Sequence, residues 1–242
     1  MTATPRINEA CRIRIERVGR ERSPVLVIDD LLADPAAFID TAAMLPFTPV
    51  THRAYPGIRA SVPPGYGAAV HDFVRAAICD AFELHGCDVA ASECSFSIVT
   101  TPPERLHVRQ QFPHIDSTNL HLVALLHYLC RPEQGGTSFY RHRATGFETL
   151  TPERLPEFDR VIGTELAGFR PHGYINGDTA QFERIATFAA ALNRMIVYRS
   201  ATLHSGDIPA DFRGDPDPRS GRLTANSFFM FGPAAARGSC AR

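Results

Sequence analysis

The feature that most restricts the fold is a change in hydrophobic pattern near the middle of the chain. Before it, apolar residues recur at helical spacing and form one stripe: Val70, Phe73, Val74, Ala77, Ile78, Ala81 and Phe82. After it come short β-branched and aromatic runs, at residues 95–100, 120–129, 137–140, 194–198 and 223–231. Helices followed by many short strands favour a mainly β architecture, a closed barrel or double sheet, with flanking α-helices.

Further elements surround this core pattern. Residues 24–30 predict a buried strand, and Asp34 with Pro35 predicts the start of a helix that ends near residue 45. The Pro- and Gly-broken residues 56–64 predict a loop. Residues 144–193 predict an insertion that contains a helix over 178–192, with Phe182, Ile185 and Phe188 on one face. The 242 residues are expected to form a single domain.

Composition argues against several kinds of partner and cellular location. The formal net charge is -1, from 25 basic and 26 acidic residues, so neither nucleic acid nor a membrane surface is an expected partner. Apolar stretches fall short of the roughly 18 residues of a membrane span. The six cysteines contain no Cys-x-x-Cys pair, which favours reduced thiols in a cytoplasmic protein. Oligomeric state leaves no signal in the sequence.

A His-x-Asp pair stands at His114 and Asp116. Residues i and i+2 of an extended segment point to the same face, so both side chains can converge on one ion. With a third ligand they would form a facial triad, which leaves coordination positions open and suits Fe(II). The pair alone is weak support, because His-x-Asp is short enough to occur by chance.

The expected third ligand is His204. It follows the strand-like residues 194–198 and precedes Ser205 and Gly206, which puts it where a side chain can face a cavity. The alternative is a histidine with a purely structural role. His172, in a Pro- and Gly-containing loop, is the rival ligand.

Arg222 and Thr224 open the last predicted strand and share one face. A guanidinium beside a hydroxyl can bind a carboxylate in a fork. The alternative is a surface arginine in an ion pair. A metal triad followed by a carboxylate receptor, in that order, favours the functional interpretation.

Taken together, these motifs resemble the Fe(II)/2-oxoglutarate-dependent oxygenase superfamily, and within it the prolyl-hydroxylase-like members. The likeness also rests on Gly135-Gly136-Thr137-Ser138-Phe139 and on the opening Val27-Ile28-Asp29-Asp30. It implies a double-stranded β-helix (jelly roll) over about residues 24–232, iron held by His114, Asp116 and His204, and 2-oxoglutarate held by Arg222 with Thr224. O2 would be the oxidant and a small-molecule or peptidyl group the substrate, with succinate as co-product. Retention of Asp116 favours hydroxylation over halogenation, although several prolyl hydroxylases use Lys where Arg222 stands.

Other polar residues keep two interpretations. Tyr128 is either a hydrogen-bond donor to the co-substrate or a core tyrosine. His121 and His127 are expected to be polar residues of a strand near the site or under a helix. Two rival functions also stay open: another cupin-like metalloenzyme, such as a different dioxygenase or a zinc hydrolase, and a non-catalytic sensor on the same barrel.

Overall fold

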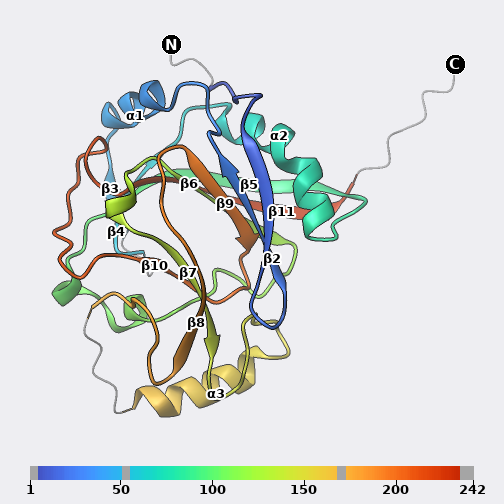
Figure 1. Cartoon of the computed structure of the whole chain (residues 1–242), viewed down its shortest axis with the longest axis vertical. Helices are drawn as coiled ribbons and strands as arrows, with labels where there is room; N and C mark the ends of the chain where they lie inside the picture. The colour runs from blue at the N-terminus through green and yellow to red at the C-terminus, as the bar shows by residue number, and fades with distance from the viewer. Residues whose placement is uncertain (1–4, 51–54, 168–172, 235–242) are drawn as a thin grey trace, which may run out of the picture.

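The computed structural model describes residues 5–50, 55–167 and 173–234. Within these residues, the strands form an eight-stranded sheet, in the order β1-β2-β9-β6-β11-β5-β4-β3, and a three-stranded sheet, β10-β7-β8. Neighbouring strands pair antiparallel, and the two sheets face each other (Figure 1). The fold is therefore the mainly β jelly roll that the sequence predicts.

The large sheet is built from β1 (Arg12–Val18), β2 (Ser23–Asp29), β3 (Thr48–Pro49), β4 (Gly57–Ser61), β5 (Cys87–Val99), β6 (Leu122–Tyr128), β9 (Arg194–Arg199) and β11 (Leu223–Pro233). The small sheet is built from β7 (Gly136–His142), β8 (Phe182–Phe188) and β10 (His204–Asp207). The helices are α1 (Pro35–Ala43), α2 (Tyr66–Ala81) and α3 (Leu155–Leu166), with 3-10 turns η1 (Pro103–Arg105), η2 (Val108–Gln111) and η3 (Pro132–Gln134).

Helices α1 and α2 cover the outer face of the large sheet (Figure 1). The Asp34 side chain accepts a hydrogen bond from the Ala37 amide, which caps α1 as predicted. In α2 the predicted stripe is buried at Val70, Val74 and Ile78, and it packs against the sheet. Burial of each such side chain stabilises the fold by roughly 1.5–3 kcal/mol.

The inner face of the large sheet packs against the small sheet. Strand β2 shows the alternation: Val25 and Val27 belong to the inner core, whereas Leu26 and Ile28 face the helices. A strand buried on both faces is apolar at every position, which explains the continuous apolar run in the sequence. The inner core does not fill the space between the sheets completely, because a cavity lined by residues of both sheets lies there.

One prediction about residues 144–193 is wrong, that of a helix over 178–192. Residues 182–188 form strand β8, not part of a helix, and the helix of this region is α3. The spacing of Phe182, Ile185 and Phe188 fits a helix, but it also fits a strand with a bulge at Ile185. In β8 that bulge puts Phe182 and Phe188 on opposite faces, where each is buried in a different core cluster. Pairing with β7 decides between the two, so this part of the expected insertion is a strand of the small sheet.

The sequence also misses strands at the edge of the large sheet. Residues 56–64, predicted as a loop, contain β4, which pairs with β5. Gly57 permits this pairing, because a Cβ atom there would lie 1.9 Å from the Ile98 carbonyl oxygen. The polar N-terminal segment contains β1, which pairs with β2 along its whole length.

Among the described residues, no helix is long and apolar enough to cross a membrane. The described cysteines, at positions 11, 79, 87, 94 and 130, are free thiols. The cytoplasmic location, the single domain and the absence of nucleic-acid and membrane partners remain predictions from the sequence.

Candidate metal centre and adjoining cavities

His204 begins β10, directly after the turn that follows β9. Its Nδ1 lies 2.9 Å from the Thr202 carbonyl oxygen, and a carbonyl can only accept, so Nδ1 carries the proton. The Nε2 lone pair is therefore free to bind a metal ion. The residue is only 6% exposed, and the Tyr198 ring packs against it with centroids 4.8 Å apart.

The segment that carries His114 and Asp116 is fixed by main-chain hydrogen bonds. The His114 and His204 amides each donate to the other residue's carbonyl at 2.9 Å. The Asp116 amide donates to the Ser200 carbonyl, also at 2.9 Å. This short antiparallel bridge aligns the His-x-Asp segment with β10, so the side chains of positions 114 and 116 share a face.

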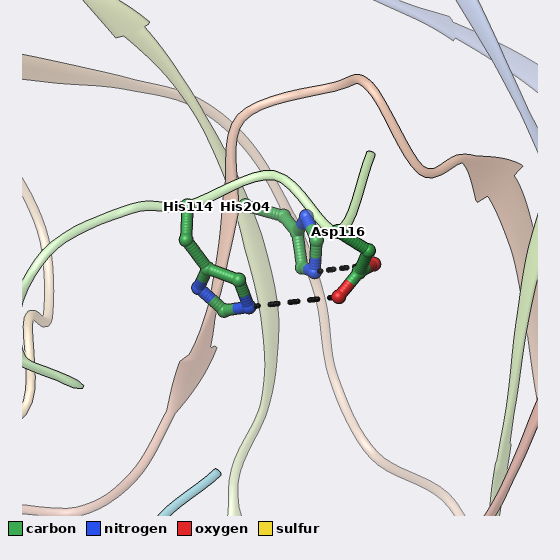
Figure 2. Close-up of side chains that lie close together, drawn as sticks. All are labelled: His114, Asp116 and His204. Carbon is green, nitrogen blue, oxygen red and sulfur yellow. Dashed lines mark ion pairs between the residues drawn. The ribbon is translucent and has the colours of Figure 1, made fainter. Parts of the chain in front are cut away.

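The three side chains converge on one point (Figure 2). His204 Nε2 lies 3.6 Å from Asp116 Oδ2, and His114 Nε2 lies 4.0 Å from Asp116 Oδ1. One ligand atom from each residue lies within 4.8 Å of the others. Neighbouring ligands of a small octahedral divalent ion with bonds of about 2.1 Å are about 3 Å apart, so an ion would draw the side chains about 1 Å closer.

The electrostatics of the cluster suit a cation. Desolvation by the surrounding protein and repulsion from His204 lower the pKa of His114, whereas Asp116 opposes this shift. A low pKa keeps the imidazole neutral, which is the form that binds metals. The His114 side chain is 48% exposed and lines both adjoining cavities, so an ion bound there would stay accessible.

An inner cavity of about 140 Å³ lies between the sheets beside the triad. Its lining includes Thr137 of β7, Gly206 of β10 and Arg222, directly before β11. Arg222 is 4% exposed, and its Nη2 donates to the Gly136 carbonyl at 2.8 Å. Its Nε is buried without a hydrogen-bond partner, and no described carboxylate forms an ion pair with it.

A buried guanidinium that keeps an unused donor is costly unless a ligand completes its hydrogen bonds. Arg222 therefore fits the carboxylate receptor that the sequence predicts, because a guanidinium binds carboxylates and because its Nε has no hydrogen-bond partner.

Tyr128 and Thr224 lie beside Arg222 but do not line the inner cavity. The Tyr128 hydroxyl donates to Thr137 Oγ1 at 2.7 Å, and the Thr224 hydroxyl donates to the Ser97 carbonyl at 3.3 Å. Burial raises the pKa of Tyr128, so the phenol stays protonated. The hydroxyl that reaches the cavity is that of Thr137, and direct contact of Tyr128 or Thr224 with a co-substrate remains a prediction.

A larger outer cavity of about 760 Å³ opens on the other side of the triad. Tyr55, Pro56, Arg59 and Phe228 line both cavities, as do His114 and Asp116. Sequence reasoning missed Tyr55 and Arg59, because residues 56–64 show no strand periodicity and no recognisable motif. The Pro56-Gly57 pair was the dominant local signal there.

The remaining histidines divide between structure and surface. His127 is fully buried under the helices, with Nδ1 3.1 Å from the Tyr66 hydroxyl and Nε2 3.2 Å from Asn193 Oδ1. His121 is exposed. His172, the rival third ligand, lies outside the described residues.

The family model for DUF6445, a family of unknown function, matches residues 9–229. The chain belongs to this family. No protein with a curated description matches it significantly.

Solved structures share its fold at low sequence identity. SnoN, a non-haem α-ketoglutarate-dependent epimerase from nogalamycin biosynthesis, is 14% identical with a TM-score of 0.50, over 87% of this chain and 79% of SnoN. HygX from Streptomyces hygroscopicus, solved with nickel, 2-oxoglutarate and hygromycin B bound, is 14% identical with a TM-score of 0.47, over 89% and 85%. SnoK, a non-haem α-ketoglutarate-dependent carbocyclase from the same biosynthesis, is 11% identical with a TM-score of 0.48, over 87% and 80%.

These likenesses concern the fold alone. The nearer resemblance to prolyl hydroxylases stays a prediction from the sequence.

Proposed function

We propose that this DUF6445 protein is an Fe(II)- and 2-oxoglutarate-dependent oxygenase that hydroxylates an organic substrate. One observation carries the proposal: two histidines and one carboxylate converge at the mouth of a cavity in which Arg222 keeps a buried, unpaired guanidinium nitrogen. Two nitrogen ligands and one oxygen ligand suit Fe(II) with open positions. When bound, the metal and 2-oxoglutarate would activate O2, which is the oxidant, with one oxygen atom going to the substrate and the other to succinate as CO2 is released.

The chain's own residues would bind and orient. His114, Asp116 and His204 would hold the ion, with the Thr202 carbonyl fixing the His204 ring. Arg222 would pair with the far carboxylate of 2-oxoglutarate, beside the Thr137 hydroxyl. The aromatic rings of Tyr198 and Phe139 against His204 would exclude water from that side of the site.

The reaction is the finer part of the proposal. Hydroxylation is favoured over halogenation, because Asp116 occupies the position that halogenating relatives leave to a halide. SnoN, which shares the fold, is an epimerase, so the product has to be identified by experiment. The substrate would be a small molecule or a peptidyl group that enters through the outer cavity.

The deciding experiment is an anaerobic titration of metal-free protein with Fe(II) and then 2-oxoglutarate, followed by visible absorption. We expect a broad charge-transfer band that requires both additions, and succinate formation once air is admitted. His114→Ala should lose both signals, whereas His121→Ala, which changes an exposed histidine, should keep them. Bound iron without a band would overturn the proposal in favour of another cupin-like metalloenzyme or a non-catalytic sensor.

Arg222 is tested separately. Arg222→Leu should raise the 2-oxoglutarate concentration needed for the band at least tenfold, about 1.4 kcal/mol, without changing the affinity for Fe(II). Arg219→Leu provides the control, because Arg219 is an exposed residue that pairs with Asp40. An unchanged co-substrate requirement in Arg222→Leu would remove Arg222 from its proposed role.

A further inference from the structure

The outer cavity has a charged end beside the triad and an apolar remainder. Arg59 and Tyr55 lie where the two cavities meet, and both residues line both cavities. Apolar side chains also line the outer cavity: Phe228, which lines both cavities, and Ile115, Leu122 and Met230. A ligand that fills this space would therefore meet a guanidinium near the metal and apolar side chains beyond it.

Arg59 is held in place by the sheet. It lies on β4, in register with Ser97 of β5, and Ser97 is in turn in register with Thr224 of β11. Its guanidinium carbon lies 4.7 Å from the centre of the Tyr55 ring, a cation–π contact that orients the group. The side chain is thus positioned by a strand and a ring.

The hydrogen bonds of its guanidinium are nevertheless incomplete. Arg59 Nε is buried without a partner, and among the described residues no carboxylate lies within ion-pair distance of the guanidinium. The buried hydroxyls of Tyr55 and Ser97 lie close to each other and have no other hydrogen-bond partner. An unpaired buried donor costs about 1–3 kcal/mol, and more when the group is charged, so the Arg59 Nε points to a ligand that completes its hydrogen bonds.

The Tyr55 phenol is a donor at any ordinary pH. Burial raises its pKa to about 12, although Arg222 and Arg59 act in the opposite direction. Together with the guanidinium it offers N–H and O–H donors and no negative charge. That set matches a planar carboxylate, which accepts two hydrogen bonds from an arginine and further bonds from neutral donors.

Glu93 lines the same outer cavity and has to be considered, because an acidic residue repels anions. It lies four residues from Ser97 along β5, which at about 3.3 Å per residue is about 13 Å from the register position of Arg59. At that distance its repulsion is screened in water. The ionic side chains beside the triad therefore include Arg59 and Arg222, with Asp116 as the one carboxylate of the triad itself.

We infer that Arg59 and Tyr55 form a second carboxylate receptor, which binds the primary substrate, and that this substrate is an organic acid with an apolar body. The inference rests on the proposed function, in which Arg222 is reserved for 2-oxoglutarate in the inner cavity. Arg59 faces the outer cavity as well, so it can hold a carboxylate beside the metal without displacing the co-substrate. Ile115, Leu122, Phe228 and Met230 would contact the apolar part.

The test uses pairs of probes that differ only in charge: phenylacetate, 3-phenylpropanoate and octanoate, each against its own primary amide. Each is titrated into the anaerobic Fe(II)- and 2-oxoglutarate-loaded protein, and the shift of the charge-transfer band reports binding near the metal. We expect at least one acid to bind tenfold or more tightly than its amide. In Arg59→Leu that acid should lose tenfold or more in affinity, while Arg59→Lys should retain part of it.

Two controls separate the outcomes. Arg12→Leu, a change at an exposed arginine, should leave acid binding unchanged, and thermal unfolding shows whether Arg59→Leu is folded. Acids that bind no better than their amides would overturn the inference, as would an Arg59→Leu variant that weakens 2-oxoglutarate instead of the acid. If wild-type protein gives no band at all, the proposed function fails, and the same acid–amide pairs measured by thermal shift still test Arg59.

Discussion

At the scale of single residues, the site depends on the main-chain carbonyl of Thr202 and on the small size of Gly206, which has no side chain. The Thr202 carbonyl fixes the proton of His204 on Nδ1 and so presents Nε2 to the ion. Gly206, two residues after His204, leaves open the space between the triad and Arg222. A Cβ atom at Gly206 would lie 3.5 Å from Ile208 Cδ1 and 3.7 Å from Arg222 Nη2.

This space predicts a selective effect of Gly206→Val. The first added carbon would make ordinary contacts, but the branched methyl groups would extend into a cavity of only about 140 Å³. We expect the apparent affinity for 2-oxoglutarate to fall tenfold or more, with the affinity for Fe(II) unchanged, both measured by the anaerobic titration. Gly163→Ala on α3 is the control, because a Cβ there meets nothing within 4 Å. Equal co-substrate affinity in Gly206→Val and wild-type protein would contradict the prediction.

The sequence could predict the convergence of His114 and Asp116 because a spacing of two fixes their common face in any extended segment. It could propose His204 and Arg222 because each adjoins a strand with a clear pattern. Arg59 and Tyr55 were beyond reach, because their position depends on β4 pairing with β5. That pairing is a long-range contact which leaves no local periodicity.

At the scale of elements, His127 joins strand β6 to the helices that cover it. Asn193 Oδ1 can only accept, so His127 Nε2 donates to it, and Nδ1 accepts from the Tyr66 hydroxyl at the start of α2. Both nitrogens are therefore satisfied in the neutral ring. Desolvation lowers the pKa of His127 to about 4, although the bond to Asn193 opposes the shift.

This shift predicts a loss of stability in mild acid. The folded-state pKa lies below the unfolded value of about 6.5, so the unfolded chain binds the proton first and stability falls as the pH drops below about 6.5. Between pH 7.5 and pH 5 the contribution is about 2 kcal/mol. Urea unfolding of wild-type and His127→Leu proteins at both pH values measures it. The pH-dependent loss should be about 2 kcal/mol smaller in the variant, and equal losses would show that His127 does not titrate on unfolding.

The sequence predicted an element correctly where one local signal dominated, and it failed where pairing with another strand determines the secondary structure. The apolar stripe of α2 and the Asp34 cap of α1 are local, and both are confirmed. In residues 182–188 the spacing of Phe182, Ile185 and Phe188 fits a helix, and only a bulge at Ile185 lets the same residues form a strand. Only the neighbouring β7 selects the strand, through register pairs such as Phe139 with Ala186. Helix α3 packs Leu155, Phe158, Ile162 and Leu166 against one core cluster, a helical spacing that is present in the sequence but was missed there.

At the scale of the whole molecule, the site joins the two sheets. His204 belongs to the small sheet, and Arg222 precedes the first residue of β11 in the large sheet while donating to Gly136 of β7. A 2-oxoglutarate molecule bound between the triad and Arg222 would span this gap. Ligands that bind only the folded state stabilise it. The metal should therefore raise the unfolding temperature by itself, and the co-substrate should raise it further once the metal is bound.

The last prediction concerns that order, with Ni(II) as a metal that does not turn over. Ni(II) alone should raise the unfolding temperature, and 2-oxoglutarate should raise it further only when Ni(II) is present, because its chelating end needs the ion. At 100-fold excess over Kd, each ligand contributes about 2.7 kcal/mol, or about 5–10 °C for a chain of this length. His114→Ala should lose both increments and Arg222→Leu only the second. If 2-oxoglutarate raised the unfolding temperature of metal-free protein as much as that of the Ni(II) form, Arg222 alone would bind it. The triad would then have no part in binding the co-substrate.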